Sequence, residues 1–430
     1  MSQTVSEATA VDPGAIAPDT GKPMPGIHKA RFMAGFIIFN ILWVMGGAAG
    51  SGVLLPARFS TLDIGLAPEA ILASMNSISI VFALISNLVF GALSDATRSR
   101  FGKRTPWIVP GGLVTALGFW LTSTADSLFT IVAFWSVLQI GLNLMIAPCV
   151  AILSDRIPEN IRGTMSAFYG VGQTVGGALG AILGAAFITN QTTGFILATI
   201  ILAVTGLVTV VIMPREQSSL NAEVEKVSVK EMVMRFRPPI KGARDFYLAL
   251  VGRLLLILGY YMIYGYQLYI CQKYIGLSTT EAAATISIMS TITMVCSLAS
   301  ALVSGPISDK IGKRKMPVVV SSVVMCIALA VPWLAPSKTS MLIFAAVMAL
   351  GYGVYTAVDQ ALNVDVLPSP EEAGKDLGIL NLANTAGQII APLVTSAIVL
   401  TTGSYALAFP GAIISILLGA VFIMFIKKTK

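Results

Sequence analysis

Long apolar segments alternate with short polar ones along almost the whole chain. A transmembrane helix needs about 20 predominantly apolar residues, and the pattern supplies twelve segments of roughly that length. They are predicted at residues 33–55, 72–94, 106–124, 128–152, 163–187, 194–213, 246–271, 282–304, 317–335, 340–364, 377–400 and 404–426. The pattern therefore predicts an all-α polytopic membrane protein with twelve transmembrane helices.

A motif that occurs twice divides these segments into two groups of six. Each copy follows the second span of its group and combines small, acidic and basic residues. The residues are Gly91, Asp95, Arg98, Arg100, Gly102, Lys103 and Arg104 in the first copy, and Gly305, Asp309, Gly312, Lys313 and Arg314 in the second. A second pair of stretches, 155–158 and 365–368, recurs in the same order. Internal repeats of this kind are typical of secondary transporters built from two pseudo-symmetric bundles.

The repeat also predicts the domain organisation. Residues 33–213 and 246–426 form the two six-helix bundles, and the polar segment 214–245 links them. Residues 1–32 lack an apolar core, so we expect a disordered tail without a cleaved signal peptide. Residues 427–430 form a short C-terminal extension.

Charge placement predicts the orientation. Only 11% of the residues are charged, against about 25% in a typical soluble protein. Outside the spans, every Lys and Arg except Arg58, Lys273 and Lys338 falls on the side that carries the N-terminus. Cations concentrate on the cytoplasmic side of membrane proteins, so both termini are expected in the cytoplasm. This topology accounts for the net charge of +7, and we expect no nucleic-acid partner.

The residues that commonly carry catalysis or bind metals are sparse. His28 is the one histidine, and the four cysteines all lie in apolar spans without a C-x-x-C spacing. No metal site, cofactor or disulfide is predicted, and no nucleophile–base pair indicates an enzyme.

Two ionisable residues, Arg253 and Asp359, lie well inside predicted spans. Each would cost about 2.5–3.5 kcal/mol if it faced lipid at mid-membrane, so each should face a cavity or the other residue. At 1.5 Å per residue they lie about 12 Å and about 9 Å from the cytoplasmic ends of their spans. We therefore predict an ion pair, which either couples and gates transport or is a static contact between helices.

Amide and aromatic side chains recur at helical spacing on several spans. The candidate substrate-binding residues are Asn40, Trp43, Gln139, Asn143, Tyr169, Gln173, Tyr260, Tyr264, Gln267, Tyr352, Tyr355, Asn384 and Gln388. Amides and hydroxyls can bond sugar hydroxyls, and aromatic faces can cover a sugar ring. Each residue could instead bond a neighbouring helix. Glycines at positions 172, 176, 180 and 184 predict close helix packing, which we expect at the interface between the bundles.

The first copy of the repeated motif, from Ser94 to Ile108, resembles that of the glycoside–pentoside–hexuronide:cation symporters and the related sucrose transporters of the major facilitator superfamily. Pro148 to Asp155 resembles the sucrose-transporter pattern as well. The resemblance implies a central cavity lined by spans one, four, seven and ten, and a motif that latches the cytoplasmic side. It also implies a glycoside-type substrate. The chain departs from the pattern at Gln139, where those transporters carry a proton-accepting acid, and at Val150, where they carry arginine.

These observations predict a monomeric plasma-membrane symporter that moves a small sugar-like solute together with a cation, with the proton the first candidate. One alternative is a proton-coupled efflux antiporter for small amphipathic compounds, because such antiporters also have a glycine-rich fifth span. Another is a membrane protein that does not transport, such as a sensor or a membrane-embedded enzyme.

Overall fold

The computed structural model describes residues 13–220, 238–240, 242–311, 315–368 and 373–427. Two bundles of long helices make up this part of the chain. The first bundle contains α1 (Gly26–Ala49), η2 (Gly50–Leu54), α2 (Leu55–Phe59), α3 (Pro68–Asp95), α4 (Thr105–Thr124), α5 (Leu128–Asp155), α6 (Glu159–Ala186) and α7 (Gln191–Ile212). The second contains α9 (Arg244–Tyr264), α10 (Gln267–Tyr269), η3 (Ile270–Tyr274), α11 (Thr279–Ile311), α12 (Lys315–Leu334), α13 (Lys338–Asp365), α14 (Ala373–Thr402) and α15 (Ala408–Met424).

Each predicted span overlaps one of these helices, and the predicted fold class is confirmed. α1, η2 and α2 form one continuous helical run, so they correspond to a single span. Nine of the described helical segments are long and apolar enough to cross a membrane by themselves. The remaining spans correspond to α4, α6 and the shorter α15.

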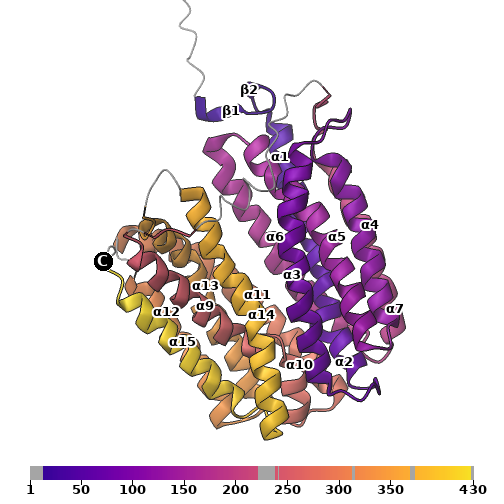
Figure 1. Cartoon of the computed structure of the whole chain (residues 1–430), viewed down its shortest axis with the longest axis vertical. Coiled ribbons are helices and arrows are strands. Elements are labelled where there is room, and N and C mark those ends of the chain that lie inside the picture. The colour runs from indigo at the N-terminus through magenta and orange to yellow at the C-terminus, as the bar shows by residue number, and fades with distance from the viewer. Residues whose placement is uncertain (1–12, 221–237, 241, 312–314, 369–372, 428–430) are drawn as a thin grey trace, which may run out of the picture.

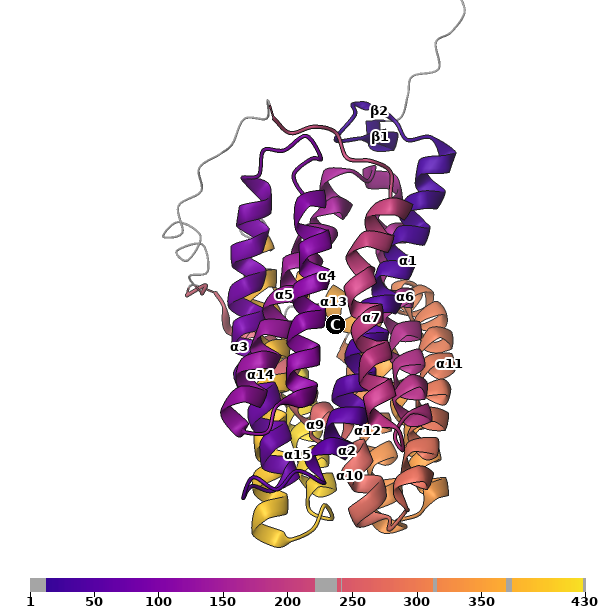
Figure 2. The ribbon, with the colours of Figure 1, turned by 90° about the vertical axis from the view of Figure 1, so that its right-hand side faces the viewer.

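The two bundles are closest at one end of the molecule. Figure 1 shows them meeting at the end that carries α2 and α10 and diverging toward the end that carries β1 and β2, and Figure 2 shows the long helices running between these two ends. Helices α3 and α14 lie side by side across the interface, and so do α6 and α11. The hydroxyl of Ser77 on α3 donates to the carbonyl of Ile389 on α14 at 2.7 Å. We call the end with α2 and α10 the closed end, and the other the diverging end.

The glycine ladder of α6 packs inside the first bundle. A Cβ at Gly176 would lie 2.8 Å from the carbonyl oxygen of Ile41, and one at Gly180 would lie 2.6 Å from that of Met45. The placement predicted for the ladder, at the interface between the bundles, is therefore wrong. Because α1 and α6 run parallel, successive glycines of α6 lie against carbonyl groups of successive turns of α1.

Two further predictions are also wrong: the disorder of residues 13–32 and the continuity of the seventh span. Residues 13–32, expected to be a disordered tail, contain the 3-10 turn η1 (Pro13–Ala15), the paired strands β1 (Ile16–Ala17) and β2 (Lys22–Pro23), and the start of α1. Asp19 anchors this segment through an ion pair with Arg156 at 2.9 Å. The seventh span is interrupted because α9 ends at Tyr264 and a turn precedes α10, so Gln267 does not continue the helical stripe of Tyr260 and Tyr264.

Candidate functional site

The two intramembrane charges meet inside the second bundle, as predicted. Nη1 of Arg253 on α9 lies 3.3 Å from Oδ2 of Asp359 on α13, and both side chains are 4% exposed. Nε of Arg253 donates to Oδ1 of Asn384 on α14 at 2.8 Å. Nδ2 of Asn363 donates to the same Asp359 oxygen at 3.0 Å. The ion pair and its hydrogen bonds therefore connect α9, α13 and α14. Amide groups supply further hydrogen bonds to both charges.

A cluster of tyrosines adjoins this pair. The ring of Tyr260 on α9 stacks on that of Tyr352 on α13 with centroids 4.1 Å apart, and on that of Tyr264 at 5.2 Å. Tyr355 lies 6.0 Å from Tyr352 and one helical turn before Asp359. The structure thus brings four of the five predicted tyrosines into one aromatic group beside the ion pair.

A cavity of about 590 Å³ lies between the bundles. Its polar lining comes from both bundles and comprises Asn87 on α3, Asn143 on α5, and Asn381, Thr385 and Gln388 on α14. Nδ2 of Asn87 donates to Oδ1 of Asn143 at 2.9 Å, and Nδ2 of Asn143 donates to the carbonyl of Gln139 at 2.9 Å. The predicted residues Asn143 and Gln388 therefore share one cavity. Asn87 was not predicted from the sequence, although it is an amide within an apolar segment.

Other candidates in the first bundle are engaged in local contacts. Asn40 is fully buried, donates to the carbonyl of Phe36 at 2.8 Å and accepts from the indole nitrogen of Trp43 at 3.0 Å. The Tyr169 ring packs against Phe36 at 6.2 Å. Asn40, Trp43 and Tyr169 do not line the cavity between the bundles.

The first copy of the repeated motif forms a bonded hairpin within the first bundle. The guanidinium of Arg104, 3% exposed, bonds Asp95 on α3, and its Nη2 bonds Asp155 on α5 at 2.6 Å. Gly102 has a φ of +90°, which favours glycine. The described partners of Asp95 lie in its own bundle, so the predicted latch between the bundles is not engaged in this structure. In the second copy, Gly305 and Asp309 are described only as part of the α11 backbone, and Gly312, Lys313 and Arg314 lie outside the described residues.

Glu216, at the start of the linker, caps α4. Its carboxylate accepts from the backbone nitrogens of Lys103 at 2.8 Å, Arg104 at 3.0 Å and Thr105 at 2.9 Å. A carboxylate at a helix N-terminus satisfies unpaired donors and complements the helix dipole. A Cβ at Gly102 would lie 2.1 Å from Cδ of Glu216. Glu216 was not predicted from the sequence, because the residues it caps are more than 100 positions away.

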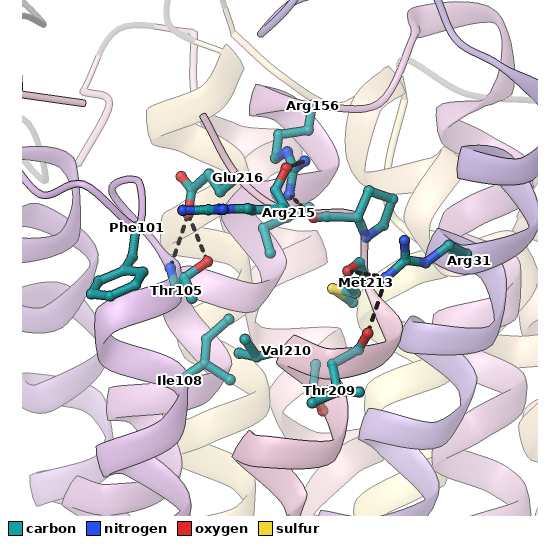
Figure 3. A pocket seen from close by; sticks show the side chains of 13 residues that line it. Arg31, Phe101, Thr105, Ile108, Arg156, Thr209, Val210, Met213, Arg215 and Glu216 are labelled. Atoms are coloured by element: carbon teal, nitrogen blue, oxygen red, sulfur yellow. Dashed lines mark hydrogen bonds between the residues drawn. The ribbon is translucent and has the colours of Figure 1, made fainter. Parts of the chain in front are cut away.

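A second cavity, of about 440 Å³, lies beside this capped end (Figure 3). Its walls include Arg31, Arg156 and Arg215 together with Glu216. Nε of Arg31 donates to the carbonyl of Ile212 at 2.7 Å, and Nη1 of Arg156 donates to that of Pro214 at 3.0 Å. These carbonyl groups lie at the C-terminus of α7 and just beyond it. Cations are favourable there because the helix dipole is negative at its C-terminus and its last carbonyl groups lack partners within the helix. The two guanidinium groups fix the start of the linker on the first bundle. Within the described residues, no group of three or more His, Cys, Asp or Glu side chains could hold a metal ion.

The fold and the site define a class of protein. A polar cavity between two six-helix bundles, with a charged pair inside one bundle, is typical of membrane transporters that work by moving two halves. The model of the Major Facilitator Superfamily matches residues 32–290 and 249–430. The chain belongs to this superfamily and is a multi-pass membrane transporter.

Solved structures are similar in fold. A POT family transporter in complex with 5-aminolevulinic acid superposes with a TM-score of 0.71 at 14% identity, over 95% of this chain and 98% of that one. A bacterial homolog of the human lysosomal transporter Spinster, inward-facing and unoccupied, gives 0.69 at 15% identity over 94% and 96%. A D-xylose-proton symporter gives 0.67 at 16% identity over 94% and 99%.

Similarity in sequence to a curated relative covers a short stretch of the chain. An uncharacterized symporter of Synechocystis sp. (strain ATCC 27184 / PCC 6803 / Kazusa) is 39% identical over 59 residues. This match spans 14% of the present chain and 11% of the relative's length.

Proposed function

We propose that the protein is a symporter that carries a glycoside or oligosaccharide across the plasma membrane together with a cation, with the proton the first candidate. The observation that carries this proposal is the buried contact between Arg253 and Asp359. It lies beside stacked tyrosines and is hydrogen-bonded to Asn384. A proton-accepting acid, a fixed cation and aromatic faces thus adjoin one another in the second bundle.

The chemistry of the lining supports a neutral, polyhydroxylated substrate. Asn143, Asn381 and Gln388 supply amide donors and acceptors to the cavity between the bundles. The tyrosine cluster supplies flat faces that can cover a sugar ring. The similarity to a D-xylose-proton symporter and to an uncharacterized symporter of Synechocystis sp. is consistent with this class of transport.

The ion pair supports cation coupling. A proton that binds Asp359 removes its charge, and Arg253 is then left with Asn384 as its described partner. An unpaired buried arginine is unfavourable, so protonation of Asp359 would favour a rearrangement in which Arg253 finds a substrate hydroxyl or water. Gln139 has no titratable group, so Asp359 takes the coupling role in this proposal.

The arrangement of the bundles supports alternating access. We assign residues 33–213 and 246–426 to the two moving halves and 214–245 to their linker. With the N-terminus in the cytoplasm, the diverging end faces the cytoplasm and the closed end faces outward. The structure then corresponds to an inward-facing state.

The proposal is tested by uptake of a panel of labelled glucosides into proteoliposomes, with and without an inward proton gradient and then with sodium. Gradient-dependent accumulation of one sugar is the expected result. Equilibration without accumulation would indicate a uniporter. No uptake of any sugar would refute the proposed substrate class and move the assignment toward efflux of amphipathic compounds.

A further inference from the structure

A buried carboxylate joins the two bundles at the closed end. Glu69 lies in the first turn of α3 and is 2% exposed. Its Oε1 accepts from Nζ of Lys273 in η3 at 2.5 Å and from the hydroxyl of Tyr405, between α14 and α15, at 3.0 Å. The acid comes from the first bundle and both donors come from the second, so this contact exists only while the closed end remains closed.

Two further tyrosines surround this contact. The Tyr266 hydroxyl lies 3.4 Å from the backbone carbonyl of Glu69 and donates to that of Pro392 at 2.8 Å. The Tyr269 hydroxyl donates across the interface to the carbonyl of Pro56 at 2.9 Å, and its ring lies 5.3 Å from Nζ of Lys273. Tyr266 and Tyr269 thus add two polar contacts between the bundles at the end that carries Glu69.

The physical chemistry makes this cluster specific for one conformation. A buried carboxylate is tolerated only when cations and hydroxyls replace its lost water. Separation of the bundles would remove Lys273 and Tyr405 from Glu69 and expose the carboxylate at a helix N-terminus, where water and the helix dipole stabilise it. The hydrogen-bonded ion pair is therefore specific to the closed conformation, and opening requires that its contacts be exchanged for water.

We propose that Glu69, Lys273 and Tyr405 form the outer gate of the transporter, a charge-dependent lock that must open before the opposite side can receive substrate. This inference rests on the alternating access in the proposed function, but not on the identity of the substrate or of the coupling cation. Glu69 sets how often the outer end opens, and it acts as a gating residue outside the cavity between the bundles.

The test is hydrogen–deuterium exchange of the full chain in lipid nanodiscs, without substrate or gradient. Glu69→Lys places two cations together across the interface, and like-charge contacts of this kind shift such an equilibrium by about 10²-fold or more. We expect faster exchange at the closed end, in residues 66–75 and 268–278. We also expect slower exchange in residues 80–88 and 378–388, which line the cavity between the bundles, because the two ends cannot open together.

The double reversal Glu69→Lys with Lys273→Glu restores the pair and should return both ends to the wild-type pattern. Asp126→Lys is the matched control, because Asp126 is an exposed acid in the loop between α4 and α5, at the same end. Faster exchange at the closed end without slower exchange elsewhere would mean that the substitution destabilises only the local structure. This result would refute the proposed gate. A double reversal that departs from the wild type as much as Glu69→Lys does would also overturn the gate. Because no transport is measured, a protein that carries no glycoside would still give a decisive result.

Discussion

Replacing Asp359 with asparagine separates a coupling role of the ion pair from a static one. The substitution keeps the size of the side chain and its capacity for hydrogen bonds but removes the charge that faces Arg253 at 3.3 Å. The arginine stays buried, with Asn384 as its described hydrogen-bond partner. The perturbation is therefore one uncompensated cation inside the second bundle.

The cost of that cation follows from its burial. Both side chains are 4% exposed, so the penalty is that of breaking a buried pair, about 3–5 kcal/mol. This is a large part of a typical folding stability of about 5–15 kcal/mol. For a chain of 430 residues, we expect Asp359→Asn to lower the Tm by about 3–6 °C. The double variant Arg253→Gln with Asp359→Asn removes both charges and should recover most of this loss, because replacing a whole buried pair is often nearly neutral.

Two assays on the same proteins complete the comparison. Thermal unfolding in detergent measures stability, and proteoliposomes measure gradient-driven accumulation and counterflow exchange. If the pair couples transport, the stable double variant exchanges substrate but does not accumulate it. If that variant accumulates substrate as the wild type does, the reasoning that gives Asp359 the coupling role is refuted and the pair is a structural contact.

Three further substitutions test the hairpin, the first bundle and the aromatic cluster. Gly102→Ala should lower the Tm by several degrees in thermal unfolding, because it adds a Cβ at a φ of +90° where Glu216 caps α4; an unchanged Tm would contradict this account. Gly180→Val should cost about 1–3 kcal/mol or more through overpacking of α1 on α6, whereas Gly177→Val is a control with more room, since a Cβ there meets only Val44 at 3.9 Å. Tyr352→Ala should raise the KM for the transported sugar about tenfold and also lower the Tm, because it removes a ring that stacks on Tyr260 at 4.1 Å. Tyr352→Phe keeps the stacked ring and should preserve both values; equal effects of the two on KM would argue against a role of the aromatic face.

Several features followed from the sequence because they depend on local composition or on a single large energy. The spans required only long apolar runs, and the meeting of Arg253 with Asp359 required only that neither charge face lipid. The glycine ladder of α6 was recognised as a packing surface, but its partner, α1, was misassigned. The spacing of glycines along one helix shows which face carries no bulky side chains. It does not show which neighbouring helix packs on that face.

The gate and the hairpin cap depended on contacts between residues far apart in the chain. Glu69 and Tyr405 are 336 positions apart, and Glu216 lies 111 positions from Thr105, whose backbone it caps. Each side chain looks like an ordinary polar residue near the end of a span. By itself the sequence determined the twelve spans, their division into two groups and the intramembrane ion pair. Only the tertiary structure decided which polar groups meet across and within the bundles, because that depends on how whole helices pack and not on the apolar content of any one of them.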